Sequence, residues 1–171
     1  MQPAPTDAPV ASLPPGQRVV IPEFGSDPTE AIDRLATLQP QEPPSPATLG
    51  SRDVLIGVRS AAVGWVDLLM TSGQYQHMAS PPYTPGLEYA GVVLWLGSDA
   101  AQAAAGGGGA LRIGDAVLVD GLLAGPRSVG AYQKYGGFAS YAVAPSEAVH
   151  PLPPQFSFDQ DCNLLGNFET A

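Results

Sequence analysis

The hydrophobic positions of the chain fall into short runs separated by glycine and proline. Residues 54–64 (VLIGVRSAAVG) have apolar residues at partly alternating positions, which is typical of a half-buried strand. Residues 18–25, 86–97, 116–124 and 136–145 have a similar apolar character, and we predict a strand in each. Short strands with this punctuation indicate a mainly β domain, either a small barrel or a sandwich.

Three segments depart from the strand pattern. Residues 65–73 (WVDLLMTSG) change to helical spacing, and Gly73 is a good helix terminator, so we predict a helix there. Residues 31–39 fit a strand or a short helix equally well. Residues 156–171 begin with Ser157 and Gln160 at the spacing of a capping box, which predicts the start of a helix.

Two stretches offer few side chains that could pack. Residues 1–17 repeat proline, and residues 99–110 repeat alanine and glycine. We therefore expect a disordered tail at the first stretch and a flexible loop between paired strands at the second.

Composition and charge narrow the function classes. The 171 residues suffice for one domain with a core, and 44% hydrophobic against 13% charged residues excludes a fully disordered chain. The net charge of −9 argues against a nucleic-acid partner. Cys162 is the only cysteine, so no intramolecular disulfide can form, and no apolar run reaches the length of a membrane span. We expect a cytoplasmic protein.

Five motifs occur in a recognisable order: residues 54–75 (VLIGVRSAAVGWVDLLMTSGQY), then PPYTPGLEYAGVV, LRIGDAVL, GGFASYAVAP, and PLPPQFSFDQ followed by LLGNFETA. This order resembles the medium-chain dehydrogenase/reductase superfamily, and within it the zinc-independent quinone oxidoreductase and enoyl reductase branch. The resemblance covers residues 18–171.

The resemblance implies a domain organisation. Residues 18–155 would form a GroES-like catalytic domain, a partly open β-barrel with one or two short helices, after the tail at 1–17. Residues 156–171 would start an interdomain helix. In the family a nucleotide-binding Rossmann domain follows, but no strand in these 171 residues leads into its G-x-G-x-x-G pattern. We therefore expect a truncated product, an isolated domain or an incomplete gene reading.

The resemblance also implies a reaction. In this branch NADPH transfers a hydride to a quinone or to an alkene conjugated to a carbonyl. The partner would be a small molecule, the cofactor would be held mainly by the Rossmann domain, and the full-length form could be a homodimer. The alternative is a non-catalytic GroES-like binding or scaffold module.

Three residues match functional positions of the family. Tyr75 matches a tyrosine near the nicotinamide pocket, where a phenol can donate a hydrogen bond to an oxyanion; the structural alternative is a half-buried aromatic ring. Asp67 also matches, although an acid in the first turn of a helix is stabilised by the helix dipole alone. Thr170 matches a threonine near the cofactor, or is an ordinary helical residue.

Two positions depart from the family. Relatives commonly have asparagine, which borders the cofactor, where this chain has Gly64, and many have tyrosine where it has Leu69. Both differences remove hydrogen-bonding groups from the expected site. They leave room for an altered substrate preference or for a non-catalytic relative.

A zinc site is not expected. Gly86-Leu87-Glu88 stands where zinc-dependent relatives have Gly-His-Glu, and leucine cannot bind zinc. His77, His150 and Cys162 are scattered along the sequence without ligand spacing. We predict instead that Glu88 is a partly buried carboxylate that accepts hydrogen bonds.

Overall fold

The computed structural model describes residues 13–103 and 111–168. Its main sheet has five antiparallel strands in the order β6-β3-β4-β5-β7. The strands are β3 (Asp53–Ala61), β4 (Tyr89–Leu96), β5 (Ala116–Val119), β6 (Tyr141–Pro145) and β7 (Val149–Pro151). β6 and β7 form opposite edges of this sheet, so within the described residues the sheet is open, as expected for a partly open GroES-like barrel.

The interior strand β3 is buried on both faces over residues 54–56, which explains the apolar run there. Val54 and Ile56 point into the main core together with Val93 of β4. Leu55 points to the other face, where it packs with Tyr141 and Val143 of β6. β3 therefore belongs to two hydrophobic clusters at once.

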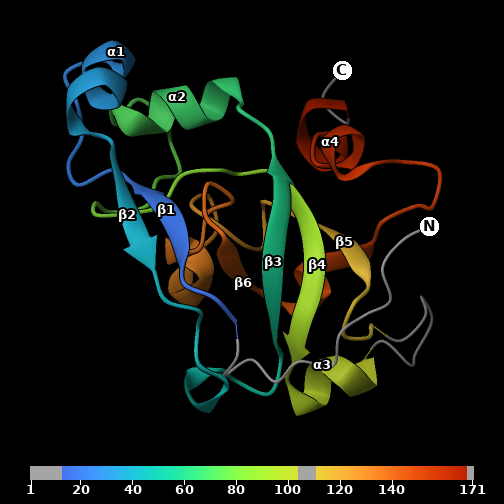
Figure 1. Ribbon diagram of the computed structural model, residues 1–171. Coiled ribbons are helices and arrows are strands. Elements are labelled where there is room, and N and C mark those ends of the chain that lie inside the picture. The colour runs from blue at the N-terminus through green and yellow to red at the C-terminus, as the bar shows by residue number, and fades with distance from the viewer. Residues whose placement is uncertain (1–12, 104–110, 169–171) are drawn as a thin grey trace.

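A second sheet pairs β1 (Gly16–Val20) with β2 (Thr37–Gln41) and lies beside the first (Figure 1). The side chain of Gln41 joins the two sheets, because it donates to the carbonyl of Tyr141 at 2.8 Å and accepts from its N–H at 3.0 Å. The N–H of Val19 also donates to the carbonyl of Phe138 at 2.8 Å. These bonds hold the β1-β2 pair, the N-terminal hairpin, against β6 and the segment just before it. β6 is the edge strand of the main sheet that lies next to β3.

The helices are short and lie at the two ends of the main sheet. α1 (Pro28–Glu30), α2 (Trp65–Thr71) and α4 (Phe158–Asp161) lie at one end, and α3 (Ser98–Ala103) lies at the other (Figure 1). π-helical turns follow α1 at Ala31–Leu35 and α4 at Leu164–Phe168. The 3₁₀ turns are Pro46–Thr48, Gly130–Lys134 and Ser146–Ala148.

Both predicted helix signals are confirmed. Gly73 has a φ of 72° just after α2. At α4, the Ser157 hydroxyl accepts from the N–H of Gln160 at 3.3 Å, and the Gln160 side chain accepts from the N–H of Ser157 at 3.0 Å. The ambiguous segment 31–39 divides into a helical turn and the start of β2.

The expected loop over 99–110 is wrong for its first part, since residues 98–103 form α3. Ala100 is fully buried in the main core, and the Ser51 hydroxyl donates to the Asp99 carboxylate at 2.6 Å. Alanine is also the best helix former, so local propensity and packing agree here. The rest of the predicted loop lies outside the described residues, as does most of the predicted tail.

The five predicted strands are all shorter in the structure, most of all those over 116–124 and 136–145. β5 ends at Val119 because Asp120 accepts from the N–H of Leu122 at 2.8 Å and turns the chain. β6 begins only at Tyr141, because Gly136 and Gly137 pack closely against the carbonyls of residues 84–85 and the ring of Tyr89. β7 was not predicted, since three residues carry too little pattern.

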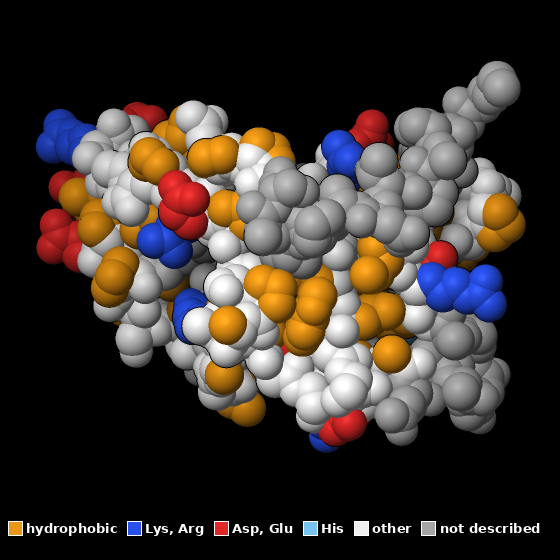
Figure 2. Space-filling model, turned by 60° about the horizontal axis from the view of Figure 1, so that its bottom comes forward, with side chains coloured by type: hydrophobic (Ala, Val, Ile, Leu, Met, Phe, Trp, Pro, Cys, Tyr) orange, Lys and Arg blue, Asp and Glu red, His pale blue; other side chains and the backbone are white. Residues whose placement is uncertain are grey.

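The end of the molecule that carries α3 has apolar side chains gathered near its centre and charged side chains scattered around them (Figure 2). Every helix in the described ranges is too short or too polar to cross a membrane.

Candidate functional site

The N-terminus of α2 is built around the carboxylate of Asp67. This side chain is only 4% exposed. One oxygen accepts from the N–H of Gly64, the residue before the helix, at 3.1 Å. The other oxygen accepts from the N–H groups of Gly86 at 2.9 Å and Leu87 at 3.2 Å. Asp67 therefore ties the first turn of α2 to the loop that precedes β4.

Burial raises the pKa of Asp67, while the three backbone N–H groups and the charge of Arg127 oppose that rise. Burial raises the pKa of Tyr83, and the negative charge of Asp67 adds to that rise. The Tyr83 hydroxyl is buried and has no hydrogen-bond partner among the described residues. In this position Asp67 fixes backbone geometry. Its catalytic assignment stays a prediction.

The loop that Asp67 holds is also fixed from the other side. The N–H of Gly137 donates to the carbonyl of Gly86 at 2.8 Å, and the N–H of Phe138 donates to that of Pro85 at 2.9 Å. Gly86 has a φ of 104°, and a Cβ there would overlap the backbone of Gly137. Only glycine fits this place, because it alone tolerates both the conformation and the close approach.

Tyr75 lies just after α2 and is half-buried. Its ring packs against a cluster that includes Met70, Tyr83 and Leu87. The ring of His77 approaches it edge-on, with 6.5 Å between ring centroids. Tyr75 thus shares a cluster with a residue that Asp67 binds, and the structure brings these two predicted site residues into one region.

An apolar groove of about 770 Å³ runs between α1 and α2, a feature that the sequence pattern did not reveal. Trp65, Leu68 and Leu69 line it from α2, and Ile32 lines it from the π-helical turn. The rest of the lining is Pro28 and three polar residues, Asp27, Thr29 and Asp33. Trp65 is 72% exposed and Ile32 is 48% exposed. Large apolar side chains left open in a groove are typical of a site that binds something apolar.

The two departures from the family pattern both lie at α2, Gly64 directly before its first residue and Leu69 in its last turn. Leu69 lines the groove. Gly64 stands before the helix, and a Cβ there would meet only the Asp67 carboxylate, at 3.3 Å. A side chain at position 64 therefore fits only when the Asp67 carboxylate shifts by a few tenths of an ångström.

The C-terminal segment approaches the same end. Glu88 is half-buried just before β4, and its carboxylate lies directly against Gly166. Cys162 is buried, with its sulfur 3.6 Å from the Ser60 hydroxyl. Burial raises the pKa of this thiol. Thr170 lies outside the described residues, so its predicted role stays a prediction.

Within the described ranges, no three His, Cys, Asp or Glu side chains gather as metal ligands would. Leu87, at the position that the comparison with zinc-dependent relatives singled out, is 5% exposed and packs with Met70 and Tyr83. The side chain at position 87 is therefore part of a hydrophobic core cluster.

Comparison with known proteins agrees with this geometry. The family model of the alcohol dehydrogenase GroES-like domain matches residues 50–154. Human quinone oxidoreductase is 32% identical over 118 residues, which are 69% of this chain and 30% of that protein. The chain thus spans less than a third of that relative's length.

Two solved structures have the same fold. A quinone oxidoreductase from Pseudomonas syringae pv. Tomato DC3000 gives a TM-score of 0.66 at 22% identity, covering 90% of this chain and 39% of that one. A protein from Sinorhizobium meliloti 1021, assigned as a zinc-binding dehydrogenase and solved bound to NADP, gives 0.64 at 18% identity, covering 88% and 42%. With the family match, the open barrel and the motif order, the chain belongs to the GroES-like domain family, in the quinone oxidoreductase branch of the medium-chain dehydrogenase/reductase superfamily.

Proposed function

We propose that this chain is the substrate-side domain of a zinc-independent oxidoreductase that reduces quinones or α,β-unsaturated carbonyl compounds with NADPH. The observation that carries the proposal is the apolar groove along α2, which lies at the end of the domain where Asp67 and Tyr75 are fixed. The similarity to human quinone oxidoreductase supports the reaction class. The NADP bound to the Sinorhizobium protein supports the cofactor.

The groove would bind the acceptor. The indole of Trp65 and the aliphatic side chains of Leu69 and Ile32 suit the flat, apolar body of a quinone or an enone. Because Leu69 replaces a side chain that could hydrogen bond, we expect shape and apolar contact to select the acceptor more than directed polar contacts do.

NADPH, when bound, supplies the hydride. Among the described residues, Gly64 and Tyr75 would border its nicotinamide end, and Thr170, which lies outside the described residues, is proposed as a third neighbour. No glycine-rich turn among the described residues leads from a strand into a long helix, so the pyrophosphate would be held by another part of the polypeptide.

The chain's own residues would handle the charge that develops on the acceptor. The phenol of Tyr75 would donate a hydrogen bond to the oxygen that becomes an oxyanion. Asp67 would act through position alone, since its oxygens already accept three backbone N–H groups. The expected cytoplasmic location and the homodimer stay predictions.

The test uses a polypeptide that joins residues 1–171 to the nucleotide-binding half of its own longer gene or of a relative. It should bind NADPH and reduce a quinone or an enone. Tyr75→Phe should lower kcat roughly 10- to 100-fold while NADPH affinity and thermal stability change little, because the ring is kept. Tyr135→Phe, a half-buried tyrosine away from the groove, is the matched control and should leave kcat unchanged.

The alternative function is a non-catalytic binding module, which the missing polar groups at Gly64 and Leu69 favour. A joined protein that binds NADPH tightly but reduces no acceptor in a broad panel would support that alternative and reject the enzyme.

A further inference from the structure

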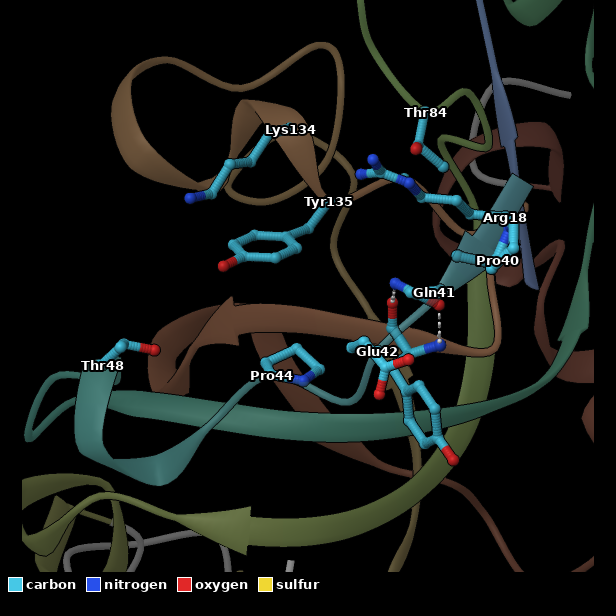
Figure 3. Close-up of a pocket in the computed structure, with 12 residues that line it drawn as sticks. Arg18, Pro40, Gln41, Glu42, Pro44, Thr48, Thr84, Lys134 and Tyr135 are labelled. Atoms are coloured by element: carbon cyan, nitrogen blue, oxygen red, sulfur yellow. Dashed lines mark hydrogen bonds between the residues drawn. The ribbon is translucent and has the colours of Figure 1, made fainter. Parts of the chain in front are cut away.

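A second hollow, of about 320 Å³, lies beside the N-terminal hairpin (Figure 3). Arg18 of β1 and Thr84 of the loop before β4 line it on one side. Lys134 and Tyr135, at the end of the 3₁₀ turn Gly130–Lys134, line it on another. Glu42, just after β2, lies at its lower margin in Figure 3.

The charges in this hollow are unusual for so acidic a chain. The protein has a net charge of −9 and only seven basic residues, and Lys134 is its only lysine. Two of the seven therefore meet at one hollow. In the described part of the chain neither forms an ion pair with a carboxylate, although Arg52 and Glu147 do so elsewhere at 3.0 Å. The ammonium of Lys134 lies instead 5.0 Å from the centre of the Tyr135 ring.

The walls of the hollow are held by backbone contacts. The Gln41 amide is committed to the peptide of Tyr141 through two hydrogen bonds, so it is a fixed part of the wall. A Cβ on Gly136 would overlap the carbonyls of Thr84 and Pro85, so these two segments are in close contact. The backbone beside the two cations is thus fixed, while the exposed side chains of Arg18 and Lys134 can adjust to a ligand.

We propose that this hollow binds a small oxyanion, the carboxylate or phosphate group of a small molecule. The planar guanidinium of Arg18 can pair with two oxygens, and Lys134 adds a mobile point charge. The volume suits a small ligand. The carboxylate of Glu42 would repel a second anionic group on the ligand. We therefore expect the rest of the ligand to be neutral or cationic.

This site is separate from the acceptor groove. None of the residues that line the groove lines the hollow. One link between the two regions is the loop before β4, in which Thr84 lines the hollow and the N–H of Gly86 donates to Asp67. Another is the chain from Ile32, which lines the groove, to Gln41, which lines the hollow. The inference therefore goes beyond the proposed function and can hold or fail independently of it.

The test titrates the 171-residue chain at pH 7 and constant ionic strength with inorganic phosphate in one arm and propionate in the other, followed by calorimetry and by amide NMR shifts. We expect saturable binding in at least one arm, with shifts at Thr84, Tyr135 and Gly136 and none at Trp65 or Leu69. Which arm binds tighter distinguishes a phosphate ligand from a carboxylate ligand.

Three variants should move the affinity in predicted directions. Arg18→Gln should weaken binding about tenfold, since a charge-assisted pair is lost, and Lys134→Gln should weaken it about threefold or more. Glu42→Gln should tighten binding, because a nearby negative charge is removed. Arg34→Gln makes the same charge change outside the hollow and should stay within about twofold of the parent.

Non-saturable binding in both arms, shifts spread over the whole surface, or equal weakening by Arg34→Gln would each mean adventitious ion binding only and would overturn the proposal. All the substituted side chains are exposed, and the fold of each variant is checked from its thermal midpoint.

Discussion

At the scale of single residues, the carboxylate of Asp67 is the most constrained group near the proposed acceptor site. It is buried, it accepts three backbone N–H groups, and it has the charge of Arg127 nearby. Burial nevertheless dominates and raises its pKa. The ionised form is thus less favourable in the folded state than in the unfolded chain.

This raised pKa predicts how the stability of Asp67→Asn compares with that of the parent at different pH. A raised folded-state pKa contributes stability that is complete below the unfolded pKa, about 3.9, and is lost as pH rises through the folded-state pKa. The stability advantage of the parent over the variant should therefore be largest at acid pH and shrink toward neutrality. Urea unfolding across this range measures it.

Glu30→Gln is the contrasting control. Hydrogen bonds from the hydroxyl and N–H of Ser26 lower the pKa of Glu30, so its contribution should be lost as pH falls, in the opposite direction. If the stability advantage of the parent over Asp67→Asn grew with rising pH, burial would not be the dominant influence on the pKa of Asp67.

Gly64→Asn gives a second prediction at this scale. A Cβ at this position lies 3.3 Å from the Asp67 carboxylate, which has to shift by a few tenths of an ångström. Asparagine is also a good residue before a helix, and we expect this gain to offset the shift, so that the variant is about as stable as the parent. In the polypeptide joined to a nucleotide-binding half, it should raise kcat by restoring a polar group beside the cofactor. Gly86→Asn is the control that should destabilise the fold. Residue 86 has a φ of 104°, and the backbone of Gly137 leaves no space for a side chain there. A loss of stability in Gly64→Asn would show that the space is not usable.

At the scale of elements, the sequence pattern located most strands, and both helix signals, at α2 and α4, hold in the structure. It missed features that depend on distant contacts. Nothing around residues 99–103 shows that Ala100 is buried by the main core. Nor does the spacing of Ile32 and Trp65 reveal that a helical turn and a helix more than thirty residues apart form one groove.

For the candidate site, the sequence identified residues but not the contacts between them. Family motifs brought Asp67 and Tyr75 to attention, and both lie near Leu87 in the structure. That Asp67 binds the N–H groups of Gly86 and Leu87 could not be read from either segment alone. The contact depends on the turn that Gly137 and Phe138 impose on the same loop from the other side.

The link between the two sheets gives an element-scale prediction. Gln41→Ala removes both hydrogen bonds to the peptide of Tyr141 and should lower the free energy of unfolding by about 1–3 kcal/mol, because a partly buried N–H and C=O lose their partners. Gln39→Ala is the matched control on the same strand, since the Gln39 amide bonds only to the exposed Thr37 hydroxyl at 3.1 Å. Chemical denaturation compares them, and equal losses would mean that the link contributes nothing specific.

At the scale of the whole molecule, we predict that the chain binds no stoichiometric zinc. Leu87 occupies a core position where a ligand would be needed, and His77, His150 and Cys162 lie on separate elements. Elemental analysis of protein purified without chelator should give well below one zinc per chain. One zinc that survives dialysis would refute this.

A further whole-molecule prediction concerns activity. The 171 residues alone should not oxidise NADPH at a useful rate, because without a segment that holds the pyrophosphate the gain from orienting the two reactants, about 7–11 kcal/mol in favourable cases, is not available. The assay is NADPH absorbance with excess quinone. Turnover comparable to that of the joined polypeptide would contradict it.

The strand order also sets a sequence of events during synthesis on the ribosome. β3 can pair with β4 early, but its other neighbour, β6, is made much later, and the bond from Gln41 to Tyr141 spans 100 residues. Until then the nascent chain carries an unpaired apolar edge at Val54–Ile56, and Gln41 lacks the peptide that it binds in the folded protein. Such non-local pairing folds slowly, and an unpaired edge invites aggregation. A polypeptide that stops before Tyr141 should therefore depend on chaperones, whereas one that continues past Pro145 can close the edge by itself.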